Sequence, residues 1–298
     1  MRLFTLSVLL LLSAQLQAQQ CSGPGRTPQT AIVVCGTLTF SQTTAPSCNA
    51  PDLPLTPGCP TIAMPASNSV WYRFHCYQTG TLGFLITPTV ASDDYDWQVM
   101  NITGLNPQAV TTTNLAFSVN FSGIPGVTGC SPAGSLDSRC AGGGAGTQFN
   151  RMPTLTAGSD YLLVVNNCCQ GFSGYGLSFT GGTAVLTDNQ LPTITNVGPA
   201  GCNTSQINVQ FSEDVLCSSI SAPGSSFIIT DGTTTYPIAN YTSQCSTGQN
   251  AITSLTFNMQ NPLPPGNYNL QVAAGSVIDV CETEILAGSF PFTIAAQP

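Results

Sequence analysis

The sequence contains no lysine, and its charged residues of either sign are few. It has 5 basic residues, all of them arginine, 13 acidic residues and 1 histidine, for a net charge of −8 at pH 7. A nucleic-acid partner is not expected, because phosphate binding needs clustered positive charge. The absence of lysine excludes Schiff-base chemistry, and a single histidine, His75, argues against a Ser-His-Asp or Cys-His site. We therefore expect a protein that is not an enzyme.

Long hydrophobic runs are also missing, except at the N-terminus. Arg2 precedes an apolar run too short to anchor stably in a bilayer, and a small residue, Ala18, offers a cleavage position. Residues 1–18 are thus predicted to be a secretory signal peptide. Lipidation of Cys21 is not expected, because glutamines precede it where small residues are usual. No later segment predicts a membrane span, and we expect a secreted or cell-surface protein.

Helical periodicity is almost absent, although 42% of the residues are hydrophobic and a core can form. Short runs rich in Val, Ile, Thr, Tyr and Phe alternate with Gly, Pro, Asn and Ser, which is typical of an all-β protein. Strands are predicted at 69–76, 80–88 and 94–102, and the segments 159–168 and 174–182 resemble a closing antiparallel pair. The polar, proline-containing stretch 186–201 marks a boundary, and about seven further short strands follow it, as in an immunoglobulin-type sandwich.

Parts of the sequence resemble known bacterial modules. The runs "NSVWYRFHCYQTGTLGFLITPTVASDDYDWQVMNITG", "TAGSDYLLVVNN" and "GYGLSFTGG" resemble the jelly-roll domain of large exported proteins of gliding bacteria, which is similar to the pre-peptidase C-terminal (PPC) sandwich. "PTITNVGPAGCNTSQINVQFSEDVLCSSI" and "PLPPGNYNLQVAAGSVIDVC" resemble a bacterial Ig-like module. In such proteins further repeats and a sorting domain usually follow, whereas this sequence ends at Pro298; it is either a short secreted member or a truncated product.

The resulting prediction is an all-β protein of two disulfide-stabilised β-sandwich domains, a jelly roll and then an Ig-like domain. Residues 19–184 are assigned to the first domain with its cysteine-rich start, 185–191 to a linker, and 192–298 to the second domain. The 13 cysteines fit an oxidising compartment. Their odd number leaves at least one without an intrachain partner, for which the vicinal Cys168-Cys169 is the expected place.

The disulfide pairing is only partly constrained by the sequence. Near-neighbour pairing in the first domain predicts three bridges: Cys21–Cys35, Cys48–Cys59 and Cys130–Cys140. In the second domain, strands that alternate up and down place Cys217, Cys245 and Cys281 at one pole. A bridge from Cys217 to either of the other two is then expected, and the sequence leaves that choice open. A zinc site is not expected, since no CxxC pair recurs.

The most acidic stretch of the sequence is the candidate metal site. Asp93, Asp94 and Asp96 lie at the start of a predicted strand, and Asp94 and Asp96 share one face because side chains alternate. Three carboxylates at one strand end are suited to calcium. The alternative is that the aspartates bond the turn's own amides. Glu213 and Asp279, in loops expected at one pole of the second domain, form a weaker calcium candidate, with solvated loop acids as the alternative.

Aromatic residues supply a candidate ligand site. Trp71 is out of phase with the inward-facing set of its strand, and Phe172 and Tyr175 lie in or beside a loop, so the three are candidates for a sugar-binding platform; packing in the core is the alternative. The predicted function is a non-catalytic binding or structural module of the adhesin type. Its partner would be an extracellular polysaccharide or a surface protein. The alternative is a calcium-dependent carbohydrate-binding module that assists a secreted hydrolase.

Overall fold

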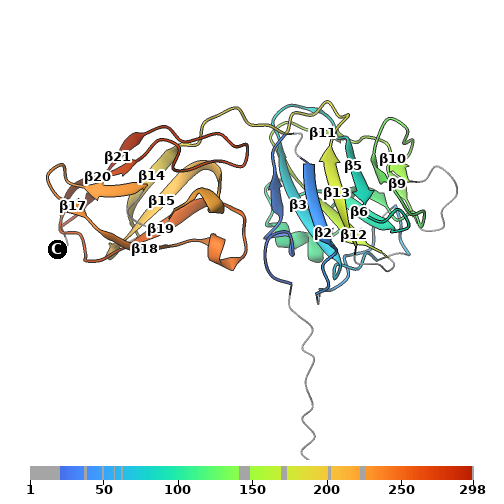
Figure 1. The fold of residues 1–298 in the computed structure, drawn as a ribbon, viewed down its shortest axis with the longest axis horizontal. Helices are drawn as coiled ribbons and strands as arrows, with labels where there is room; N and C mark the ends of the chain where they lie inside the picture. The colour runs from blue at the N-terminus through green and yellow to red at the C-terminus, as the bar shows by residue number, and fades with distance from the viewer. Residues whose placement is uncertain are drawn as a thin grey trace, which may run out of the picture.

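The computed structural model describes residues 21–36, 39–48, 50–56, 58–61, 63–140, 148–168, 173–200, 203–221 and 226–296. The predicted signal peptide, Cys169 and Phe172 lie outside these ranges. The described residues form twenty-one strands and three short 3₁₀ helices, η1 (Pro107–Thr111), η2 (Cys217–Ser219) and η3 (Gln244–Thr247). None of these helices is long and apolar enough to cross a membrane. The predicted fold class, an all-β protein built from disulfide-stabilised β-sandwiches, is confirmed (Figure 1).

The strands up to residue 179 form the N-terminal sandwich. One sheet has the order β1 (Ile32–Val34), β3 (Ser69–Cys76), β12 (Ser159–Asn167), β6 (Tyr95–Asn101), β7 (Ala116–Asn120) and β9 (Ser138–Arg139). The facing sheet has the order β10 (Phe149–Asn150), β8 (Thr128–Cys130), β5 (Phe84–Pro88), β13 (Ser173–Phe179) and β2 (Thr39–Thr44). A short antiparallel pair, β4 (Gly80–Thr81) with β11 (Thr154–Leu155), completes it.

Alternation along the strands explains which side chains fill the space between these two sheets. In β3, Val70, Tyr72 and Phe74 enter the shared core, as the sequence predicted for this face. Tyr95 and Trp97 of β6 enter the same core. Trp97 also donates from its indole Nε1 to the Thr128 hydroxyl at 3.0 Å, so its one polar atom is satisfied within the sandwich.

A second core covers the outer face of the six-stranded sheet. Trp71, Leu162 and Val164 project from that face and pack against residues of the irregular segment 50–66, among them Leu53 and Met64. The sheet is therefore buried on both faces, which explains its long hydrophobic strands such as β12. Asp96 lies on this outer face, because it alternates with the inward-facing Tyr95 and Trp97.

The strands from residue 194 form the C-terminal sandwich. One sheet has the order β14 (Ile194–Ala200), β15 (Asn203–Leu216), β19 (Ala251–Met259) and β18 (Ile238–Thr242). The other has the order β17 (Thr235–Tyr236), β16 (Phe227–Thr230), β20 (Gly266–Val272) and β21 (Gly288–Ile294). A separate core of their inward-facing side chains lies between them, including Phe227 and Phe257, whose tilted rings have centroids 5.0 Å apart.

One predicted strand pairing is wrong. The segments expected to close the first domain as an antiparallel pair, β12 and β13, belong to opposite sheets: β12 lies between β3 and β6, and β13 between β5 and β2. The chain crosses from one sheet to the other between them. Each sheet thereby gains a strand with both edges paired, whereas a hairpin would have placed both in one sheet.

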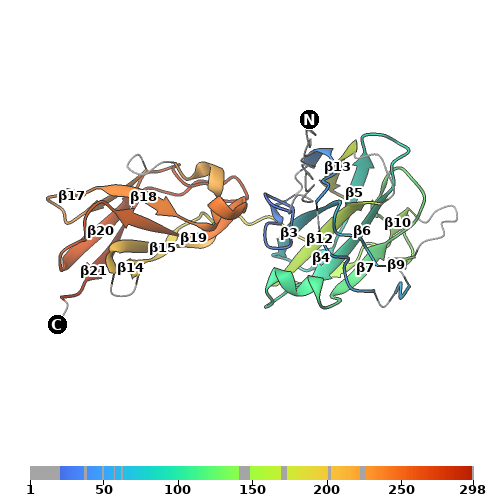
Figure 2. The ribbon, with the colours of Figure 1, turned by 90° about the horizontal axis from the view of Figure 1, so that it is seen from below.

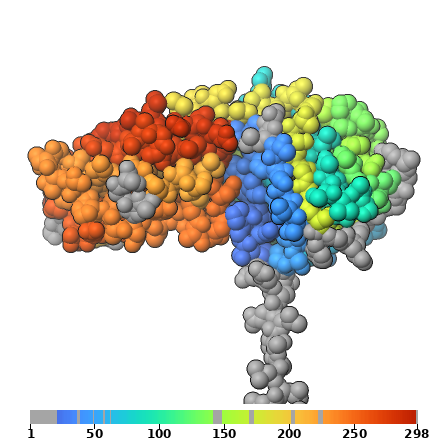
Figure 3. All heavy atoms as spheres, in the orientation of Figure 1, coloured from blue at the N-terminus to red at the C-terminus, as the bar shows by residue number. Residues whose placement is uncertain are grey.

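The two sandwiches lie end to side and touch each other. Figures 1 and 2 show the C-terminal sandwich (orange to red) beside the edge of the N-terminal sandwich where β1 and β3 lie, with the linker crossing between them. The space-filling view in Figure 3 shows the orange and red atoms meeting the blue N-terminal ones along this edge. Gly248 lies so close to the backbone of Gly23 that a Cβ on it would approach Gly23 Cα to 2.9 Å.

The disulfides differ from the predicted near-neighbour pairs. The bonded pairs among the described residues are Cys21–Cys48, Cys35–Cys281, Cys59–Cys140 and Cys217–Cys245. The predicted Cys21–Cys35, Cys48–Cys59 and Cys130–Cys140 bridges are therefore wrong, whereas one of the two options for Cys217, pairing with Cys245, is correct. Near-neighbour pairing fails because the sheet order brings distant segments together.

Among the described residues two unpaired cysteines lie where none was expected, while Cys169 of the expected vicinal pair lies outside the described residues. Cys168 is disulfide-bonded, whereas Cys76 and Cys130 are buried thiols in the core of the N-terminal sandwich. Burial raises the pKa of both thiols, most strongly that of Cys130, because the thiolate would lose its hydration. Both are small apolar core residues rather than reactive groups.

Candidate functional site

The acidic stretch is split between two surroundings. Asp94 and Asp96 point to the outer face of the six-stranded sheet, where oxygen atoms of both carboxylates and the sulfur of Cys168 lie within 4.8 Å of one another. Asp94 is half-buried, and Asp96 is 8% exposed. The prediction that these two carboxylates share a face is confirmed, and it follows from the two-residue period of a strand.

Burial sets the protonation of this pair. Desolvation, with a smaller contribution from the neighbouring Asp94 charge, raises the pKa of Asp96 to about 8. Burial raises the pKa of Asp94 as well, against the opposing effect of a backbone hydrogen bond at Tyr95. Two carboxylates in close contact with little water around them are unfavourable when both are ionised, and this favours the protonated form of Asp96.

Asp93 does not belong to the cluster. Its carboxylate accepts a hydrogen bond from the Ser173 hydroxyl of β13, and it is 5% exposed. Its backbone N–H donates to Val90 at 2.9 Å, and its carbonyl accepts from Gly126 at 3.0 Å. Asp93 therefore joins the turn before β6 to the facing sheet, and its carboxylate bonds a hydroxyl of β13 and not an amide of its own turn.

Cys168 helps to position the start of β6 but offers no metal ligand. It is disulfide-bonded, so its sulfur cannot be the thiolate that metal ions bind. Its backbone N–H donates to the carbonyl of Asp94 at 3.1 Å, which continues the pairing of β12 with β6 by one residue. This contact fixes the start of β6 against the end of β12.

A residue that the sequence did not single out completes the surroundings. Asn166 of β12 lies directly opposite Asp96 in the register and is fully buried. Its Nδ2 donates to the carbonyl of Pro65 and to the Ser69 hydroxyl, the latter at 3.1 Å, while its Oδ1 is buried without a hydrogen-bond partner. Gln98, two residues beyond Asp96, also leaves a buried Nε2 without a partner, but this atom is a donor.

The two described residues of the predicted aromatic platform, Trp71 and Tyr175, do not form it. Trp71 and Tyr175 are each 1% exposed, so neither offers a ring face to a ligand. Trp71 packs in the outer core, and the Tyr175 hydroxyl lies 2.9 Å from that of Tyr72 inside the sandwich. Burial raises the pKa of Tyr72 to about 12, as expected for a phenol that hydrogen-bonds within a core. Phe172 lies outside the described residues.

Glu213 and Asp279 come together as predicted, but Asp279 already has partners. Asp279 is completely buried and accepts hydrogen bonds from the backbone of Cys281 and Thr283, each at 2.8 Å, and from the Thr283 hydroxyl. Burial, together with the nearby charges of Asp188 and Asp279, raises the pKa of Glu213 to about 7. Among the described residues, no third carboxylate, cysteine or histidine joins the two in a cluster compact enough to share one ion. Asp279 thus organises the loop that carries Cys281.

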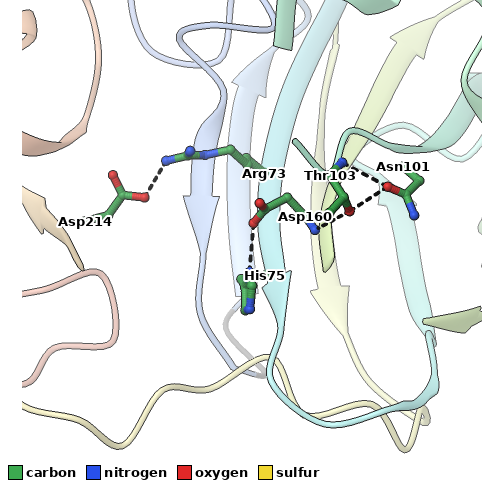
Figure 4. Close-up of polar contacts among 6 residues, drawn as sticks. All are labelled: Arg73, His75, Asn101, Thr103, Asp160 and Asp214. Carbon is green, nitrogen blue, oxygen red and sulfur yellow. Dashed lines mark hydrogen bonds and ion pairs between the residues drawn. The ribbon is translucent and has the colours of Figure 1, made fainter. Parts of the chain in front are cut away.

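That loop is part of the junction between the sandwiches. Cys281 bonds Cys35, which follows β1, across 246 residues of sequence, and the Arg73 guanidinium of β3 forms an ion pair with Asp214 of β15 (Figure 4). Arg73 and Asp214 are 33% and 22% exposed. His75, two residues beyond Arg73, lies 2.8 Å from Asp160 and does not reach the C-terminal sandwich in Figure 4.

A small cavity of about 60 Å³ lies at this junction. Its walls come from both sandwiches and include Val34, Arg73 and Leu186 on one side and Glu213 and Val280 on the other. The volume corresponds to only a few water molecules. The cavity at the junction is therefore small, and both sandwiches contribute to its walls.

Comparison with known proteins adds little about these sites. No protein-family model matches the chain, and no curated protein matches it. Among solved structures, the chain is similar to the N-terminal part of the bacterial S-layer protein SbsC. That similarity has a TM-score of 0.30 and 17% sequence identity, over 36% of this chain and 24% of that chain. The chain thus spans about a quarter of the length of the structure that it matches.

Proposed function

We propose that this chain is an exported, non-catalytic structural module of the adhesin type, in which two β-sandwiches work as one rigid unit. The observation that carries the proposal is the Cys35–Cys281 disulfide between the sandwiches. Domains joined by a short linker and a small interface usually move relative to each other. A covalent bond beside the Arg73–Asp214 ion pair removes that freedom, which suits a spacer that must hold an orientation outside the cell.

Export is supported by the same chemistry. Disulfides persist in oxidising compartments and are reduced in the cytosol. Three further bonds lie within the sandwiches, Cys21–Cys48, Cys59–Cys140 and Cys217–Cys245, and two of them tie irregular segments to the fold. Cys59, for example, belongs to the segment that covers the outer core. A structural role outside the cell fits a chain that uses its cysteines in this way.

The test combines location with adhesion. An immunoblot of fractionated native cells, using an antibody to residues 194–296, should find the protein outside the cell or at its surface with its disulfides formed. Cells that carry Cys35→Ser/Cys281→Ser should adhere less well than wild-type cells at equal surface amounts. The matched control is Cys21→Ser/Cys48→Ser, which removes a disulfide within one sandwich and should leave adhesion unchanged. A reduced protein in the cytosolic fraction would overturn the proposal, as would equal adhesion by both variants.

A further inference from the structure

The outer face of the six-stranded sheet holds two carboxylates in close contact and a buried amide oxygen without a hydrogen-bond donor. We propose that Asp94, Asp96 and Asn166 form a calcium site that joins β6 to β12. Asp96 lies on β6, Asp94 lies just before that strand, and the amide oxygen comes from the neighbouring strand β12. This inference does not depend on the proposed function, since the ion would act on the stability of the sheet.

The orientation of Asn166 is fixed by its other contacts. Its Nδ2 donates to the Pro65 carbonyl and to the hydroxyl of Ser69, which lies on β3, on one side of β12. A flipped amide would place Oδ1 against the Pro65 carbonyl, two acceptors in contact, so the observed assignment is the favourable one. Oδ1 then points to the other side of β12, where Asp96 of β6 lies directly opposite.

The distances of an antiparallel sheet place these groups within reach of one ion. Side chains of directly opposed residues start from Cβ atoms about 5 Å apart. Asp94 lies on the same face one step away, and its carboxylate comes within 4.8 Å of that of Asp96. Asn166 Oδ1 is fully buried and unpartnered. A buried acceptor without a donor is unfavourable, and a cation satisfies it together with both carboxylates.

The chemistry of the donors favours calcium over other metals. All three groups offer oxygen, which suits a hard cation, and the sulfur of Cys168 is held in a disulfide and cannot select zinc. Calcium accepts 6–8 oxygens in irregular arrangements, whereas magnesium demands a near-ideal octahedron. Three side chains fixed by two rigid strands are irregular. Asp94 is half-buried, so water molecules can complete the coordination on that side.

The experiment uses the full chain, stripped of metal with a chelator, and calcium ions alone as the probe. Isothermal calorimetry should show saturable binding of one ion, and calcium should raise the melting temperature. Magnesium at the same concentration should have a much smaller effect. Asp94→Asn and Asp96→Asn should each weaken calcium binding at least tenfold. Asp52→Asn, which removes an exposed carboxylate from the same sandwich, is the matched control and should bind like the wild type.

Two results would overturn the proposal. The first is a wild-type chain whose heat of titration and melting temperature do not respond to millimolar calcium; Asp96 would then meet Asn166 as a protonated acid. The second is a response that Asp94→Asn retains in full, which would place the ion elsewhere. Asp94 is half-buried and its asparagine variant is expected to fold, as circular dichroism will check, so the outcome does not depend on Asp96→Asn alone.

Discussion

Removing the disulfide between the sandwiches, with Cys35→Ser/Cys281→Ser, should release their relative orientation while both cores stay folded. For cysteines 246 residues apart, the chain-entropy relation gives a stabilisation of about 5.5 kcal/mol at 25 °C. That value is a ceiling, because the Cys59–Cys140 and Cys217–Cys245 bonds already constrain the unfolded loop that it closes. Each sandwich keeps its own core, so the main loss should be in docking rather than in folding.

The contacts that remain are weak. The Arg73–Asp214 pair is partly exposed, and a pair of this kind contributes about 0.2–1 kcal/mol, a factor of at most about five in the docking equilibrium. Small-angle scattering should therefore show a single compact arrangement of the two sandwiches for the wild type. For the serine variant it should show a broad distribution of their relative orientations. Adding Arg73→Ala to the serine variant should broaden the distribution of relative orientations of the two sandwiches further. The same substitution in the wild type should leave the scattering unchanged, because the disulfide still holds the sandwiches together.

The refuting result is clear. If the scattering of the serine variant superimposes on that of the wild type, non-covalent contacts at the junction hold the sandwiches. In that case Arg73→Ala alone should be tested at low and high salt, because an ion pair weakens when counterions screen it. The melting temperature of each variant, measured in parallel, separates loss of docking from loss of folding.

Three further predictions concern single side chains. Trp71→Ala should destabilise the N-terminal sandwich by about 4 kcal/mol in urea unfolding, and Trp71→Phe by much less; a loss under about 0.5 kcal/mol would mean that the ring is not in the core. Asp279→Ala should destabilise the C-terminal sandwich by about 3 kcal/mol, because three donors lose their acceptor. Asp279→Asn keeps Oδ1 and should destabilise it by about 1 kcal/mol. Equal losses for the two variants would contradict the role of Asp279 as a hydrogen-bond acceptor. Glu213 has a pKa raised from 4.5 to about 7 in the folded protein, so its contribution to stability is full below pH 4.5, is lost as the pH rises to about 7 and does not change above it. Glu213→Gln should remove this fall, which solvent screening limits to about 1 kcal/mol, and an unchanged pH profile would show that Glu213 is not its source.

The local pattern of the sequence was sufficient for the strands and their faces. The alternation in β3 placed Val70, Tyr72 and Phe74 in one core, and the same rule put Asp94 and Asp96 on one face. A strand has a fixed period of two, so these relations are decided by residues a few positions apart. The all-β class followed for the same reason.

Only part of the candidate site could be predicted from the local pattern of the sequence. Nothing near Asp96 in the sequence points to Asn166, which lies 70 positions further on and faces it only because β12 pairs with β6. Trp71 was correctly placed on the outer face, but the sequence gave no sign that segment 50–66 covers that face and turns an exposed position into a core position. Burial therefore depended on a long-range contact that no local period encodes.

The cysteines show most clearly which features depend on the local sequence and which depend on the tertiary structure. The sequence by itself determined that a disulfide-rich chain of two β-rich parts would result, because composition and alternation are local properties. The tertiary structure alone decided that Cys35 meets Cys281 and that Cys130 remains a thiol. A disulfide forms between side chains that the fold brings to about 5.1 Å between Cα atoms, as for Cys35 and Cys281, and separation along the chain does not enter that condition.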